Sequence, residues 1–174
     1  MNFDFYLFSQ INGLAGQYAW LDLIGVFFAK YFPYIVPIPI AAFLLVDKKK
    51  YFKMVVGGFA SAIFARFFIV EFIRFLIPRY RPFVNNHVNL LVGEVHQQSF
   101  PSGHAAFFFA LSTIVYYYNK KTGIVLFICS SLISFFRVFV GIHWPADIFF
   151  GAIVGILTGL VSIQIYKKYF KNNA

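Results

Sequence analysis

The sequence predicts an all-α protein, a polytopic membrane helix bundle of about five to six helices. Of its 174 residues, 60% are hydrophobic and only 12% are charged, and the mean hydropathy is +0.74. A chain of this size leaves much of its surface exposed when it folds, so the excess of apolar side chains has to face lipid. Several apolar runs approach the length of a membrane helix, and lysines gather where these runs end. We interpret residues 1–174 as a single membrane domain.

The apolar runs define the predicted helices. Four segments come close to the roughly 20 residues that cross a bilayer. They are residues 51–77, 103–118, 123–140 and 146–166, of which 103–118 is short for a full span. Residues 20–46 are apolar enough for another crossing, but Lys30 and three prolines within residues 33–39 predict a kink or an interfacial stretch first.

The amino-terminal residues differ from these segments. Residues 3–11 mix aromatic and polar side chains and end at Asn12-Gly13, which is a turn signal. An interfacial helix within residues 1–19 fits this composition, and a linker is the alternative. No small-residue cleavage site follows the stretch, so we expect it to remain in the mature protein.

Charge sets the expected orientation. The net charge is +9, and the lysines cluster at residues 48–53, 120–121 and 167–171, where apolar runs end. Excess positive charge marks the cytoplasmic flanks of membrane helices, so we expect these ends inside a multi-pass protein of the cell (inner) membrane. Basic residues confined to helix ends do not form the patch or stripe that nucleic acid requires, so no nucleic-acid partner is expected.

The opposite ends of the same helices should meet at the outer face of the membrane. They carry ionisable residues other than lysine, at 74–82, 101–104, 137 and 143–147. Arg74, Arg81 and Arg137 suit phosphate, because a guanidinium donates two parallel hydrogen bonds to its oxygens. For any single arginine, snorkelling to lipid headgroups is the alternative.

The run Pro101-Ser102-Gly103-His104 stands at the predicted start of an apolar helix. The first N–H groups of a helix have no partners within it and the dipole is positive there, so such an end binds anions. Ser102 can cap the helix or donate to phosphate, and Gly103 lets a ligand approach the backbone. A plain capped helix explains both residues equally well. It leaves His104 unexplained, whereas a leaving group beside an anion site requires a proton donor.

The run His143-Trp144-Pro145-Ala146-Asp147 places a carboxylate four residues beyond an imidazole, and Pro145 suits the first turn of a helix. A carboxylate bonded to one ring nitrogen fixes the tautomer and makes the other nitrogen more basic. The pair therefore indicates a nucleophile with its orienting acid. A structural pair that caps a helix is the alternative interpretation.

These residues resemble the type 2 phosphatidic acid phosphatase superfamily, whose signature is three separated motifs. The first is a basic residue, six positions, then Arg-Pro; it corresponds to Arg74 and Arg81-Pro82, with arginine where lysine is usual. The second, Pro-Ser-Gly-His, corresponds to residues 101–104. The resemblance covers roughly residues 51–166, which we take as the catalytic core.

The third motif is Ser-Arg, five positions, His, three positions, Asp, and it corresponds to Arg137, His143 and Asp147. Phe136 stands where the family has serine. The hydroxyl of that serine is then absent, or its role is taken by Ser134. The spacings join three separate segments, so a chance match is improbable.

The resemblance implies a metal-independent lipid phosphatase or diphosphatase that uses no cofactor. It implies that His143 is the nucleophile and forms a phosphohistidine, that Asp147 orients it, and that His104 protonates the departing oxygen. The residues implied to bind the phosphoryl group are Arg74, Arg81, Arg137, Ser102 and Gly103. Phosphoryl transfer needs positioning and charge neutralisation above all, which arginines and a helix end supply without magnesium.

The substrate expectation also rests on the resemblance. A small chain with little beyond the catalytic bundle resembles members that dephosphorylate undecaprenyl diphosphate to undecaprenyl phosphate, the carrier recycled in cell-wall synthesis. Phosphatidylglycerophosphate and phosphatidate are the alternative substrates. A rival from another class is a membrane transporter or anion-binding protein whose histidines and Asp147 relay protons without hydrolysis.

Arg66 and Glu71 precede Arg74 on one predicted helix, and we expect Glu71 to be a structural partner of Arg74. Three ionisable residues in the long loop are assigned no role: His87, Glu94 and His96. Cys129 lies in an apolar run and is interpreted as packing.

Glycines recur at four-residue intervals in the last predicted helix, at Gly151, Gly155 and Gly159. Such a stripe lets another helix approach closely. The partner helix belongs either to the same chain or to a second copy, so a homodimer through this stripe is open.

Overall fold

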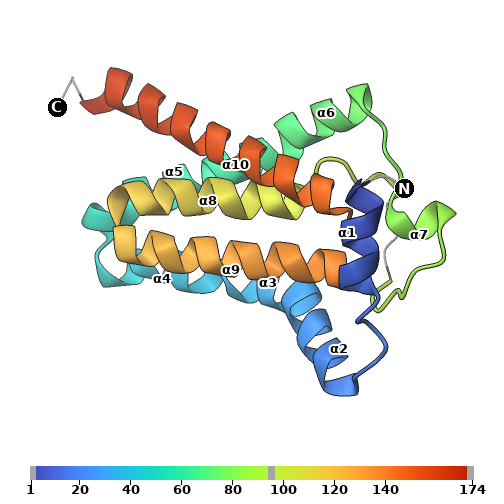
Figure 1. Cartoon of the computed structure of the whole chain (residues 1–174). Helices are drawn as coiled ribbons and strands as arrows, with labels where there is room; N and C mark the ends of the chain where they lie inside the picture. Colours follow the sequence, from blue (N-terminus) through green and yellow to red (C-terminus); the bar gives the residue numbers. More distant parts are fainter. Residues whose placement is uncertain (1–2, 94–96, 172–174) are drawn as a thin grey trace.

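The computed structural model describes residues 3–93 and 97–171, and it confirms an all-α helix bundle (Figure 1). Within the described residues, the β structure consists of one isolated bridge, between Tyr80 and Gln98. In the described part of the chain, four helical units are long and apolar enough to cross a membrane: Ala19–Val46, Lys48–Leu76, Lys120–Phe139 and Pro145–Tyr169. A shorter helix, α8 (Gly103–Tyr118), packs against three of these units. The protein is therefore a multi-pass membrane protein built around α8.

Two of the long units are interrupted by π-helical turns. The first unit runs through α2 (Ala19–Val26), η1 (Phe27–Tyr31), α3 (Phe32–Ile35) and α4 (Pro37–Val46). The second runs through α5 (Lys48–Phe64), η2 (Ala65–Ile69) and α6 (Val70–Leu76). After the single turn α7 (Pro82–Asn85) and α8 come α9 (Lys120–Phe139), α10 (Pro145–Tyr166) and η3 (Lys167–Lys171).

The lysine clusters form the first turns of the helices, although the sequence predicted that those helices begin after the lysines. Both α5 and α9 start three residues earlier than expected, at Lys48 and Lys120. Asp47 accepts a hydrogen bond from the N–H of Lys50, and Asn119 accepts one from that of Thr122. These side chains cap the helix starts, so the polar lysines form the first turns.

The predicted kink in the first unit is confirmed, and it begins before the prolines. The π-helical turn η1 precedes Pro33, and α2 leaves the direction of α3 and α4 (Figure 1). Proline lacks an N–H, so the helical hydrogen bonding around it cannot be complete, and kinks concentrate at such points.

Helix α1 (Phe3–Asn12) confirms that the amino-terminal residues form a helix and not a linker. It lies across the ends of α9 and α10 (Figure 1). Phe8 is buried against Val138 and Trp144, and its ring centroid lies 5.0 Å from that of Trp144. This aromatic contact anchors α1 on the bundle, while its place in the membrane interface stays a prediction.

Large apolar side chains cover the outside of the bundle. Leu45 is 90% exposed, Phe75 is 81% exposed and Leu23 is 73% exposed. Exposing contiguous apolar surface to water is unfavourable, and lipid removes this cost. The exposed side chains therefore fit the membrane location that the long helices indicate.

The glycine stripe of α10 is covered by α8 of the same chain. A Cβ on Gly151 would come 2.9 Å from the Cβ of Ala105, and one on Gly155 would come 2.9 Å from the backbone nitrogen of Ala110. One on Gly159 would come 2.7 Å from Cβ of Thr113. This corrects the expectation of a possible homodimer through the stripe, because α8 already occupies it.

The packing of α10 on α8 predicts a position-specific loss of stability. Gly155→Ala places a methyl group against backbone atoms, so we expect a loss of about 1–3 kcal/mol, the usual cost of overpacking. Gly57→Ala is the matched control, because a Cβ there meets only Cγ2 of Ile114, at 4.0 Å. Thermal unfolding in one detergent measures both variants, and equal midpoints would contradict this account of the interface.

Candidate active site

The site residues proposed from the sequence come from segments that meet at one end of the bundle, where α6 and α9 end and α8 and α10 begin (Figure 1). Arg74 donates from Nη2 to the carbonyl of Pro101 at 3.2 Å. Arg81 donates from Nη1 to the carbonyl of Ile142 at 2.9 Å. These bonds join the arginine segment to the start of α8 and to the turn before α10.

His143 and Asp147 are in contact, as their spacing predicted. Nδ1 of His143 lies 3.2 Å from Oδ2 of Asp147, and both side chains are almost fully buried. The same carboxylate oxygen accepts the backbone N–H of Trp144 at 2.9 Å, so it is fixed in the first turn of α10. A carboxylate beside Nδ1 favours the tautomer with its proton there, which leaves the lone pair on Nε2.

Nε2 of His143 faces the start of α8. It lies 3.4 Å from Oγ of Ser102, whose backbone N–H donates to the carbonyl of Asp147 at 2.9 Å. Ser102 is the N-cap of α8, and its Oγ also accepts the N–H of Ala105 at 3.5 Å. The unprotonated ring nitrogen is therefore directed at a helix end, where an anion binds favourably.

Burial, followed by the positive charges of Arg81 and Arg137, holds the pKa of His143 well below its ordinary value. Both effects disfavour an imidazolium ion. The ring is therefore neutral at pH 7, which is the form that can attack phosphorus. The same two arginines that suit an anion also keep this histidine unprotonated.

Arg137 is held by the kinked first unit. Its Nη1 donates to the carbonyl of Ala29 at 3.1 Å, inside the π-helical turn η1. Pro33, four residues after Ala29, has no N–H to offer that carbonyl. Arg137 thus donates to a carbonyl in an irregular stretch of helix that precedes a proline.

The structure adds two residues that the sequence analysis missed, Arg79 and Asp4. Arg79 donates from Nη1 to Oδ1 of Asp147 at 3.2 Å and forms an ion pair with Asp4. Asp4 also accepts the backbone N–H of Ala146 at 2.8 Å. Arg79 lay within the first motif, two residues before Arg81, but nothing in the sequence connected it to an aspartate at the other end of the chain.

Phe136, which replaces the usual serine, is a packing residue. Its ring stacks on Phe28, with centroids 5.2 Å apart, and packs edge-on against Phe139. Ser134 is buried, and its Oγ has no hydrogen-bond partner among the described residues. Nothing in the described structure connects Ser134 to the site.

Three other observations complete the description of the site. His104 and Gly103 line a cavity of about 400 Å³ that Arg66 shares. In the described part of the chain, no group of three or more His, Cys, Asp or Glu residues could hold a metal ion. Glu94 and His96 of the long loop lie outside the described residues.

A bundle in lipid with a buried His–Asp pair, clustered arginines and a helix start at one end belongs to the class of integral membrane phosphatases. A model of the PAP2 superfamily matches residues 55–171. The chain is a member of that superfamily and a lipid phosphatase.

Relatives match over most of the chain. It is 33% identical over 171 residues to the undecaprenyl-diphosphatase of Sulfolobus acidocaldarius, covering 95% of this chain and 79% of that protein. It is 28% identical over 161 residues to the bacitracin transport permease protein BcrC of Bacillus licheniformis, covering 92% and 78%. The crystal structure of Aquifex aeolicus LpxE has a TM-score of 0.77 and 29% identity, covering 94% of this chain and 96% of that one.

The contact of Arg79 with Asp147 predicts a catalytic role for Asp4 at a distance. Asp4→Asn removes the charge that holds Arg79, so we expect kcat for a lipid phosphate to fall about tenfold, as for one weakened charged hydrogen bond. KM should change little, because Asp4 contacts Arg79 and the backbone of Ala146 and is not among the residues expected to bind the phosphoryl group. Asp22→Asn is the control, since Asp22 accepts the exposed backbone N–H of Gly16 and has no other side-chain hydrogen bond among the described residues. Equal kcat values for the two variants would refute the connection.

Proposed function

We propose that this protein removes the terminal phosphate of a prenyl diphosphate of the undecaprenyl type, through a phosphohistidine on His143. The contact of His143 with Asp147, with Nε2 directed at the start of α8, carries the proposal. The names of the relatives support the substrate class, because the Sulfolobus acidocaldarius relative is an undecaprenyl-diphosphatase.

In the proposed first step, Nε2 of His143 bonds to the terminal phosphorus and the P–O bond to the bridging oxygen breaks. Asp147 stabilises the imidazolium character that develops on the ring. Arg74, Arg81 and Arg137, with Ser102 and the N–H of Gly103, neutralise the charge of the transferred group. His104 donates a proton to the leaving oxygen when that oxygen is basic.

In the second step, water attacks the phosphohistidine and His104 takes its proton, so phosphate leaves and the imidazole is regenerated. Neither step needs a metal, because the guanidinium groups carry the positive charge. We therefore propose that the enzyme is metal-independent and uses no cofactor.

Phosphate release in a chelator tests this function. We expect the purified protein in detergent to release phosphate from a prenyl diphosphate in excess EDTA, and His143→Ala to release none. A panel with phosphatidylglycerophosphate and phosphatidate identifies the preferred lipid. Dependence on added magnesium would refute the metal-independent mechanism, and the absence of release from every lipid would favour the transporter that the name of the Bacillus licheniformis relative describes.

Rapid-quench labelling of the enzyme separates the two histidines. His104→Ala keeps the nucleophile, so it should still form an acid-labile phosphoenzyme, and that intermediate should persist because water attack lacks its base. A label mapped to His104, or a label in His143→Ala, would reverse the assigned roles.

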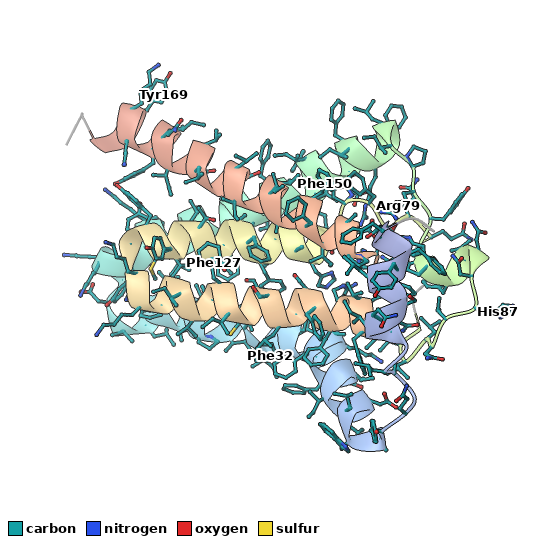
Figure 2. All side chains as sticks on the ribbon, in the orientation of Figure 1. Phe32, Arg79, His87, Phe127, Phe150 and Tyr169 are labelled. Carbon is teal, nitrogen blue, oxygen red and sulfur yellow. The ribbon has the colours of Figure 1, made fainter. Side chains whose placement is uncertain are left out.

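We also propose that the enzyme lies in the cell (inner) membrane with its active site outside. The lysine clusters of α5, α9 and η3 lie at the end of the bundle away from Arg79 and His87, as Figures 1 and 2 allow the reader to follow. Positive charge favours the cytoplasmic side.

The orientation predicts which residues a membrane-impermeant maleimide reaches in intact cells. In a protein whose Cys129 is replaced by alanine, Asn86→Cys should react at once and Lys49→Cys only after permeabilisation. The reverse pattern would place the site in the cytoplasm.

A further inference from the structure

A polar cavity of about 650 Å³ lies beside the arginines of the site. Its lining consists of Arg66, Arg74 and Glu71 with Gln97, Gln98, Phe67 and Tyr80. The charged groups of this lining suit a charged, hydrogen-bonding ligand. A cavity next to the phosphoryl site that contains two guanidinium groups indicates a second place for an anion.

The carboxylate of Glu71 contacts the guanidinium groups of both Arg66 and Arg74. Oε1 of Glu71 accepts Nη1 of Arg74 at 3.0 Å and forms an ion pair with Nη1 of Arg66. The Nε donor of Arg74 is buried and has no hydrogen-bond partner within the described ranges. Two positive charges against one negative charge leave the cluster electropositive, and a buried donor is left to be satisfied.

Arg66 also touches the start of α8. A Cβ on Gly103 would come 2.7 Å from Cζ of Arg66, so the guanidinium occupies the space that the missing side chain leaves. Arg66 belongs to the π-helical turn η2, a type of local irregularity that is frequent at functional sites. The expected structural role of Glu71 as a partner of Arg74 is confirmed, but the pair extends to Arg66 and reaches the anion-binding helix end.

Arg66 lines the same cavity as His104, the proposed proton donor to the leaving group. Arg66, Gly103 and His104 line the cavity of about 400 Å³, whose other walls are apolar residues such as Pro33, Phe107 and Phe108. His104 is the proposed proton donor to the departing oxygen. A cation that shares a mostly apolar cavity with this histidine matches a leaving group that joins a phosphate to a hydrocarbon.

We propose that Arg66 binds the inner phosphate of a diphosphate lipid and thereby makes the enzyme prefer diphosphates to monophosphates. This inference rests on the proposed function. The terminal phosphate lies at His143, the inner phosphate lies at the guanidinium group of Arg66, and the first part of the hydrocarbon enters the cavity of about 400 Å³.

Arg66 has a role of its own in the proposed cleavage of the diphosphate. When the Nε2–P bond forms, the electron pair of the breaking P–O bond stays on the bridging oxygen, which becomes a terminal oxygen of the inner phosphate. The added negative charge develops at that phosphate, so a guanidinium there stabilises the transition state. A monophosphate lipid leaves as an alcohol, which needs the proton of His104 and gains nothing from Arg66.

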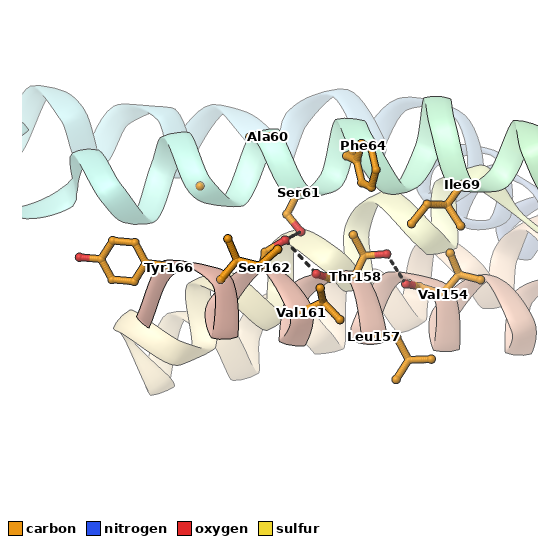
Figure 3. Close-up of a pocket in the computed structure, with 12 residues that line it drawn as sticks. Ala60, Ser61, Phe64, Ile69, Val154, Leu157, Thr158, Val161, Ser162 and Tyr166 are labelled. Carbon is orange, nitrogen blue, oxygen red and sulfur yellow. Dashed lines mark hydrogen bonds between the residues drawn. The ribbon is translucent and has the colours of Figure 1, made fainter. Parts of the chain in front are cut away.

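A larger apolar cavity is a weaker candidate for the hydrocarbon. It measures about 690 Å³ and lies between α5 and α10, where Ser162 donates to Ser61 at 3.2 Å (Figure 3). None of the proposed site residues lines it. It therefore offers no path that begins at the reacting phosphorus.

The test compares farnesyl diphosphate with farnesyl monophosphate in one detergent. We expect Arg66→Ala to lower kcat/KM for the diphosphate about 100-fold, the effect of losing one transition-state donor, and to change the monophosphate value less than threefold. Arg66→Lys should recover part of the loss. Lys53→Ala is the control and should leave both values unchanged, because Lys53 lies in the same helical unit but its Nζ is over the ring of Tyr166, 5.4 Å from the centroid.

Inhibition by inorganic anions provides a second readout that does not require turnover of the monophosphate. Arg66→Ala should weaken inhibition by pyrophosphate about tenfold and leave inhibition by orthophosphate unchanged, since only pyrophosphate reaches the second position. Equal losses for both anions, or for both lipids, would overturn the role of Arg66 while the proposed function stands. A wild-type enzyme that does not hydrolyse the diphosphate would instead refute the proposed function itself.

Discussion

The cost of burying guanidinium groups at the end of an apolar bundle governs the structure. A charged side chain at membrane depth is stable only where polar atoms surround it. Arg74 uses the carbonyl of Pro101, Arg81 that of Ile142, and Arg137 that of Ala29. Each carbonyl lies where a helix is interrupted or absent. In a regular helix these carbonyls would accept hydrogen bonds from N–H groups of the same helix. The irregular backbone therefore makes the arginine cluster possible.

The position of α8 follows from a second constraint, close helix approach. The glycines of α10 let the α8 backbone come near enough for the N–H of Ser102 to reach the carbonyl of Asp147. That bond fixes the start of α8 against the first turn of α10. Backbone contacts therefore fix the start of α8 relative to the His143–Asp147 pair, and this arrangement does not depend on flexible side chains.

Much of the fold and of the candidate site was predictable from the sequence, because the spacing of residues within a helix is a local property. The crossing segments depend on runs of about 20 consecutive residues. The contact of His143 with Asp147 and the cap by Ser102 depend on neighbours within four residues. The unpredicted features depend on contacts between distant segments. Arg79 forms an ion pair with Asp4, and Arg137 donates to the carbonyl of Ala29. The prolines that follow Ala29 predicted a kink but gave no sign of a contact with Arg137. The identity of the helix that covers the glycine stripe could likewise not be predicted from neighbouring residues.

The contact between Asp4 and the backbone of Ala146 joins residues that are 142 positions apart. A ribosome synthesises α1 long before α10, so the ion pairs around Asp147 are absent until α10 has been inserted. A chain in which α10 is not yet inserted therefore lacks the contacts that join its two ends. A bulky group attached to α1 would disturb this contact, whereas η3 lies at the opposite end of the bundle (Figure 1).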